Sequence, residues 1–110
     1  MRKIELAIPE IEKIDINGDI FEIRRSDADI LDKCADLHKK YERLKKEDVD
    51  SVKTAVNKTV SLIDDILGDG AVKKISKGRP VSMVTACKWL MAICGEINKI
   101  NDDYIKNKYE

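Results

Sequence analysis

A glycine-rich stretch constrains the fold of this sequence more than any other part of it. Residues 64–82 hold three of the five glycines and one of the two prolines, between two long segments with helical periodicity. Glycine readily adopts positive φ angles and proline cannot continue a helix, so both interrupt regular structure. The stretch predicts a reversal, a short helix over 71–76 and a second reversal. The structural residues of this connector (residues 68–81) are Gly68, Gly70, Gly78 and Pro80.

Residues 11–25 predict a β-hairpin. Asn17-Gly18 supplies the two positive-φ positions of a type I′ turn between segments of alternating apolar residues. A two-residue loop would set Ile16 opposite Asp19. One face of the hairpin would then hold Ile14, Ile16, Phe21 and Ile23. This face must cover helices or a partner, because an isolated hairpin is marginal in water.

Three longer helices are predicted over residues 26–46, 48–67 and 82–103. Ser26, Asp48 and Ser82 are the expected N-caps, since their side-chain oxygens can accept from first-turn N–H groups. Gly68 occupies the position where a helix C-terminus needs a left-handed residue.

Each of these helices carries an apolar stripe with helical spacing. The first has Ile30, Cys34, Leu37, Tyr41 and Leu44. The second has Val49, Val52, Val56, Val60 (or Thr59), Ile63 and Leu67. The last has Met83, Cys87, Leu90, Cys94 and Ile97, widened by Ala86, Ile93 and Ile100. The last helix is the most apolar and is therefore expected at the centre of the fold.

The chain ends are less regular. Residues 3–8 alternate in polarity up to Pro9, so residues 1–10 predict either an arm or an extra strand. Residues 104–110 predict a frayed end or a solvated helical extension. The expected fold is mainly α with a small β part: an N-terminal β-hairpin followed by a three- to four-helix bundle, with residues 1–110 in a single domain.

The expected location is the cytosol. No uncharged apolar run is long enough to span a membrane, and Glu5 and Glu10 stand where a signal peptide would need an apolar centre. The odd number of cysteines, Cys34, Cys87 and Cys94, without CxxC spacing predicts reduced, buried thiols.

Little in the sequence points to catalysis or cofactors. His38 is the sole histidine, and no nucleophile, zinc-protease or phosphate-loop motif is present. His38 with the three cysteines could supply a Cys3His zinc set, but each cysteine falls in an apolar stripe, which core packing explains. We expect no enzyme activity, no cofactor and no metal.

Binding residues are the remaining candidates. Lys39, Lys40, Arg43, Lys45 and Lys46 form one basic cluster, and Lys73, Lys74, Lys77 and Arg79 form another. Lys+Arg and Asp+Glu balance at 21 each, so no net positive field favours nucleic acid. Trp89 is either a second core contact or a partner anchor, and Trp89, Met91 and Arg79 are the candidate partner contacts.

The order of segments resembles a known family. The segments Ile16–Ile23, Ile63–Ala71, Lys74-Ile75 and Gly78–Ser82, followed by an apolar helix, resemble small tail assembly chaperones of long-tailed phages and prophages of Gram-positive bacteria. The resemblance spans about residues 14–100, and its specific part is the stretch IDDILGDGA…KI…GRPVS.

The resemblance implies a non-enzymatic role. Such chaperones bind the tape measure protein, keep it soluble and help recruit tail tube subunits, and they are absent from the mature virion. A homo-oligomer in the host cytoplasm is compatible with this role. The alternatives are a small DNA-associated regulator and a structural virion component.

Overall fold

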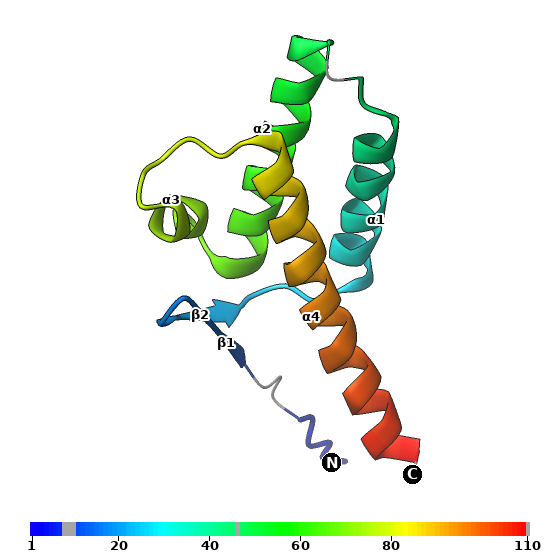
Figure 1. Ribbon diagram of the computed structural model, residues 1–110. Coiled ribbons are helices and arrows are strands. Elements are labelled where there is room, and N and C mark those ends of the chain that lie inside the picture. Colours follow the sequence, from blue (N-terminus) through cyan, green and yellow to red (C-terminus); the bar gives the residue numbers. More distant parts are fainter. Residues whose placement is uncertain (8–10, 46, 110) are drawn as a thin grey trace.

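The computed structural model describes residues 1–7, 11–45 and 47–109, with the backbone alone for 104–109. Within these residues the chain forms a β-hairpin followed by four helices (Figure 1). The elements are β1 (Glu12–Ile16), β2 (Asp19–Ile23), α1 (Ala28–Arg43), α2 (Val49–Leu67), α3 (Ala71–Ser76) and α4 (Met83–Tyr109). The mainly helical fold with a small β part, predicted from the sequence, is confirmed.

The hairpin has the predicted register. Ile16 pairs with Asp19 and Ile14 with Phe21. Asn17 and Gly18 both have positive φ angles, of 55° and 90°, and the Asp15 carboxylate accepts a hydrogen bond of 2.8 Å from the Gly18 N–H. The apolar face packs inward as expected, with Phe21 buried and Ile14 half-buried against the core.

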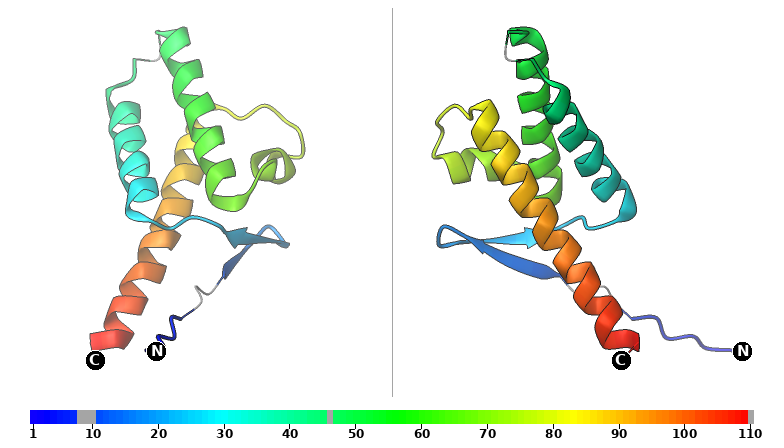
Figure 2. Two further views of the ribbon diagram at one scale, coloured as in Figure 1. Left: turned by 180° about the vertical axis from the view of Figure 1, so that it is seen from behind. Right: turned by 45° about the vertical axis from the view of Figure 1, so that its right-hand side comes forward.

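Helices α1, α2 and α4 pack against one another and enclose the core. Helix α1 runs away from the hairpin, α2 returns toward it, and α4 crosses the other two (Figures 1 and 2). Its C-terminal part extends beyond the other helices, so the molecule is elongated, with extents of 63 × 30 × 28 Å. The most deeply buried apolar side chains are Ile30, Ile63, Ile66, Ala86, Leu90 and Ile97. Three of these six belong to α4, as expected for the central helix.

Two of the three predicted helix N-caps are confirmed. Asp48 caps α2 by accepting from the Ser51 N–H at 3.2 Å, and Ser82 caps α4 by accepting from the Thr85 N–H at 3.2 Å. The expected Ser26 cap is wrong: the N-cap of α1 is Asp27, whose side chain makes no capping bond. That carboxylate instead binds the Arg25 guanidinium at 3.0–3.1 Å, and this hydrogen bond lowers the pKa of Asp27.

Two predicted helix ends also differ. Helix α1 stops at Arg43, because Leu44 has an extended conformation, whereas the predicted helix continued to Lys46, which lies outside the described residues. Helix α4 continues to Tyr109, well past the predicted end at 103. The described backbone over 104–109 is therefore the helical extension and not a frayed end; residue 110 lies outside the described part.

The connector combines two reversals with α3. Gly68 has φ 111° and ψ 155°, so its φ is positive as predicted but its conformation is extended and not left-handed. The left-handed positions are Gly70 and Lys77, which flank α3. The Asp64 carboxylate accepts from the Val72 N–H at 2.9 Å and so satisfies a free donor at the start of α3.

The hairpin is attached to the end of α2 and to α3. The Arg24 N–H donates to the Ile66 carbonyl at 2.7 Å, and the Lys74 ammonium lies 5.4 Å from the Phe21 ring centre and 3.9 Å from Asp19. The C-terminal end of α2 and Lys74 of α3 therefore hold the β part against the helices.

Helix α2 is rotated relative to its predicted core face: Ile63 and Leu67 are buried as predicted, but the valines are not. Its buried residues are Ala55, Thr59, Leu62, Ile63, Ile66 and Leu67. Of the predicted valine stripe, Val49 is 59% exposed and Val52, Val56 and Val60 are only half-buried. Thr59, the alternative to Val60 in the predicted stripe, is fully buried. Its hydroxyl donates to the Ala55 carbonyl at 2.9 Å and also bonds the Tyr41 hydroxyl.

The first residues lie outside the sheet. Residues 1–7 have no regular structure and are exposed, with Ile4 82% and Leu6 83% accessible. The sheet pairs β1 and β2 only among the described residues, so residues 1–7 form an arm rather than an extra strand; residues 8–10 are not described. Across the described helices, none is both long enough and apolar enough to cross a membrane.

Candidate partner-binding groove

A groove runs along the outer side of α2. Helix α2 forms one wall, α3 and the residues that follow it form the other, and the start of α4 closes one end. The groove has a volume of about 680 Å³. Residues 78–81 of the connector belong to its lining.

The groove is lined with valine. Five of the seven valines in the chain line it: Val52, Val56, Val60, Val72 and Val81. The other two, Val49 and Val84, lie outside it and are 59% and 55% exposed. Met83 and Pro80 add further apolar surface. Half-buried apolar residues collected in one depression are typical of a surface that binds another protein.

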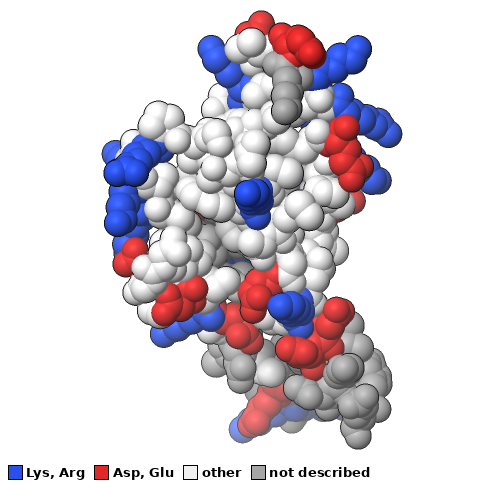
Figure 3. Space-filling model, viewed as in Figure 1, with Lys and Arg blue, Asp and Glu red and all other residues white. Residues whose placement is uncertain are grey.

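The rim of the groove is basic. Lys53, Lys73 and Arg79 line it and are exposed, and none of them forms an ion pair with a described residue. The carboxylate in the lining, Asp64, is already engaged by the Val72 N–H. In Figure 3 basic side chains gather at the edge of the molecule over α3, whereas the middle of this face is almost uncharged.

The predicted connector residues separate into two groups. Gly78 and Pro80 line the groove together with Arg79, one of the three predicted partner contacts. Gly68 and Gly70 instead line a hollow on the opposite side of α3, where the connector meets β2. The first two glycines thus lie beside the hairpin, and residues 78–80 lie in the groove.

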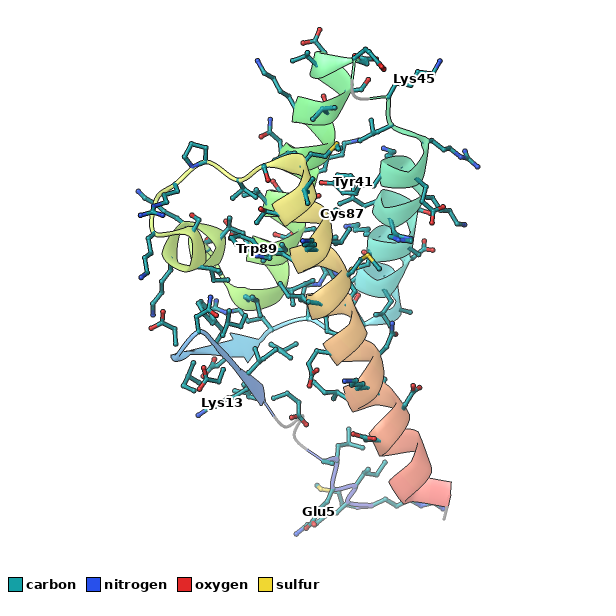
Figure 4. All side chains as sticks on the ribbon, in the orientation of Figure 1. Glu5, Lys13, Tyr41, Lys45, Cys87 and Trp89 are labelled. Atoms are coloured by element: carbon teal, nitrogen blue, oxygen red, sulfur yellow. A yellow bond between two sulfur atoms is a disulfide. The ribbon has the colours of Figure 1, made fainter. Side chains whose placement is uncertain are left out.

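The other two predicted partner contacts lie elsewhere. Trp89 points from α4 toward the side where α3 lies (Figure 4) and packs, half-buried, against the core beside Ile14, Ile16 and Ile75. This position agrees with the core alternative for Trp89. Met91 is 55% exposed at a cleft between α1 and α4. Trp89, Met91 and Arg79 therefore do not form one surface.

Comparison with known proteins gives a family but no function. The sequence matches a family described as being of unknown function, DUF6673, over residues 16–110. The chain belongs to this family. Searches of curated proteins and of solved structures found no match. The match covers every residue of the groove, and the exposed arm (residues 1–7) lies outside it.

A second hollow, between α1 and α2, is a weaker candidate. Its volume is about 480 Å³, and its lining mixes both signs of charge: Lys33, Lys40, Lys58, Asp36 and Asp65. The Lys40 ammonium faces Lys58 and lowers the pKa of that residue. Two lysines held together could accept an anion, but the neighbouring aspartates reduce that attraction.

The cysteines do not assemble a metal site. Cys34 on α1 and Cys94 on α4 are joined as a disulfide, with their Cα atoms 6.6 Å apart, so the prediction of three reduced thiols is wrong for this pair. His38 pairs with Glu42 at 3.6 Å, and Cys87 is free. Among the described residues no group of three or more His, Cys, Asp or Glu side chains could hold a metal ion.

Tyr41 bridges α1 and α2 inside the bundle. Its hydroxyl donates to the Thr59 hydroxyl, which in turn donates to the Ala55 carbonyl at 2.9 Å, and in Figure 4 Tyr41 lies close to Cys87 of α4. Burial raises the pKa of Tyr41 above its ordinary value of 10.0. A neutral, hydrogen-bonded phenol of this kind stabilises helix packing.

Sequence reasoning missed the groove because it assigned the valines of α2 to the core. A signal was present: α2 has two apolar rows, Val52-Val56-Val60 and Ala55-Thr59-Leu62-Ile66. A helix that packs against the core on one side needs only one apolar row. The second apolar row of α2 therefore indicated a second apolar surface, outside the core.

Proposed function

We propose that this protein is a non-enzymatic binding protein, a tail assembly chaperone of phages or prophages of Gram-positive bacteria. It would bind the tape measure protein, keep it soluble and help recruit tail tube subunits. It would act in the host cytoplasm and be absent from the mature virion. The proposal depends first on the resemblance of Ile63–Ala71 and Gly78–Ser82 to that family.

The observation that carries the proposal structurally is the valine-lined groove. A chaperone for an elongated helical client needs apolar surface that remains accessible in its own folded state. Val52, Val56 and Val60 provide such surface on a folded helix, and beside them lie three exposed cations that form no ion pair with a described residue.

Co-expression with the tape measure protein encoded by the same phage or prophage tests the proposal. We expect a larger fraction of the tape measure protein in the soluble lysate, and a complex of the two proteins on size-exclusion chromatography. A tape measure protein that stays equally insoluble with and without this chain would contradict the proposal.

Two measurements separate the alternatives. A DNA-associated regulator would give a firm, salt-sensitive mobility shift with DNA and no effect on the tape measure protein. A structural virion component would be found by mass spectrometry in purified particles. We expect neither result.

A further inference from the structure

We infer that the groove receives an amphipathic helix from the partner whose apolar stripe is flanked by acidic side chains. This inference rests on the proposed function, since it names the chemistry of the client segment. Its basis is the combination of an apolar floor and a basic rim in one groove.

The floor has the geometry that a helix requires. Val52, Val56 and Val60 lie four residues apart and form a single row along α2, about 12 Å long at 1.5 Å per residue. Such a row leaves a shallow trough into which the side-chain ridge of a second helix packs. Val81 and Met83 face this row from the other side of the groove. A partner helix with apolar residues at i, i+3 or i+4, and i+7 would contact both sides.

The positive charge of the rim favours a helix with acidic side chains. Lys53 stands on α2, Lys73 on α3 and Arg79 on the loop before α4, so exposed cations come from both walls of the groove. None of them has a carboxylate partner within the described chain. Asp64 is the one carboxylate among the lining residues; the hydrogen bond from the Val72 N–H does not remove its charge, but the three cations outnumber it. Acidic residues beside the apolar stripe would therefore find three unpaired cations.

The arm of a second copy fits this groove less well. Ile4 and Leu6 are exposed apolar residues with Glu5 between them, but Arg2 and Lys3 outnumber that carboxylate, so the arm would bring net positive charge to a cationic rim. An acidic partner segment is the better occupant.

Two synthetic helices test the inference by fluorescence anisotropy with the full-length chain. They share one stripe of leucines and differ only in having glutamate or lysine beside it. We expect the glutamate helix to bind about tenfold more tightly at low salt, and this preference to shrink as salt is added. Equal affinity for both helices, or preference for the lysine helix, would overturn the inference.

Variants locate the binding. Val56→Asp puts a charge on the floor, and Arg79→Glu reverses an exposed cation on the rim. Both should weaken binding of the glutamate helix about tenfold or more. Val49→Asp is the matched control, because Val49 lies on the same helix but outside the groove. If Val56→Asp does not fold by circular dichroism, Arg79→Glu decides alone. Unchanged binding by folded groove variants would refute the location.

Co-expression of the same variants with the tape measure protein separates this inference from the proposed function. If the wild-type chain solubilises that protein and Arg79→Glu does so equally well, the groove inference fails and the proposed function stands. If the wild-type chain binds the glutamate helix in the groove but leaves the tape measure protein insoluble, the groove inference stands and the proposed function fails.

Discussion

At the scale of single residues, the connector depends on backbone conformations that few side chains tolerate. Gly68 is buried, with φ 111° and ψ 155°, a region that is essentially restricted to glycine. A Cβ atom there would lie 3.0 Å from Nε of Arg24. Gly70 is left-handed with φ 80°, and a Cβ atom there would meet nothing within 4 Å. The two glycines are therefore constrained to different degrees.

We expect Gly68→Ala to lower the free energy of unfolding by roughly 2–3 kcal/mol and Gly70→Ala by roughly 1 kcal/mol. Gly70→Asn should cost least, because asparagine tolerates the left-handed region. Urea denaturation of the three variants measures this order. Equal stability of Gly68→Ala and the wild type would contradict the backbone requirement assigned to Gly68.

Tyr41 gives a prediction about pH. Because burial raises its pKa above 10.0, the folded state keeps the proton more tightly than the unfolded state does. Its contribution to stability is complete below pH 10 and is lost as the pH rises through the folded-state pKa. Near pH 8, Tyr41→Phe should cost about 1 kcal/mol through the lost hydrogen bond. The difference between wild type and variant should shrink above pH 10, which urea melts at several pH values would reveal.

At the scale of elements, α2 has two apolar faces with different roles. The row containing Ile66 is fully buried, whereas the row containing Val56 is half-exposed in the groove. Ile66→Ala should therefore cost roughly 2–5 kcal/mol of unfolding free energy, and Val56→Ala less than about 1 kcal/mol. Thermal or urea denaturation of the two variants distinguishes the faces. A larger loss from Val56→Ala would show that the valine row is the core, as the sequence first indicated.

Helices and strands with strong local sequence signals could be predicted. Which face of each helix points into the core could not. Asn17-Gly18 determines the hairpin register through turn geometry alone, and Asp48 and Ser82 act within one turn of their own helices. Which row of α2 faces inward depends on contacts with α1 and α4 that lie far away in sequence. The same holds for the groove, since its walls come from α2 and from residues about twenty positions later. Its apolar residues were recognised, but they were assigned to the wrong face.

At the scale of the whole molecule, the link between Cys34 and Cys94 joins α1 to α4 across 60 residues. We expect a peptide map of the oxidised protein to show this pair crosslinked and Cys87 alone alkylated. Closing a loop of that length stabilises a protein by about 4 kcal/mol in the chain-entropy model, so reduction should lower the melting temperature. A map that links Cys87 to either partner would contradict the arrangement of α1 and α4.

The whole molecule also separates the surface that binds from the surfaces that hold the fold together. Gly68, Gly70 and Trp89 belong to the side on which the hairpin packs, and residues 78–81 belong to the groove. Variants on the hairpin side should therefore act through stability, and groove variants through binding.

The most direct test of the central claim is a methyl NMR spectrum of the valine-labelled chain, recorded alone and in complex with the tape measure protein. Five of the seven valines line the groove, and the two outside it serve as internal controls. We predict that the methyl signals of Val52, Val56 and Val60 change most and that those of Val49 and Val84 stay in place. A complex in which Val49 and Val84 shift while the groove valines do not would contradict the account.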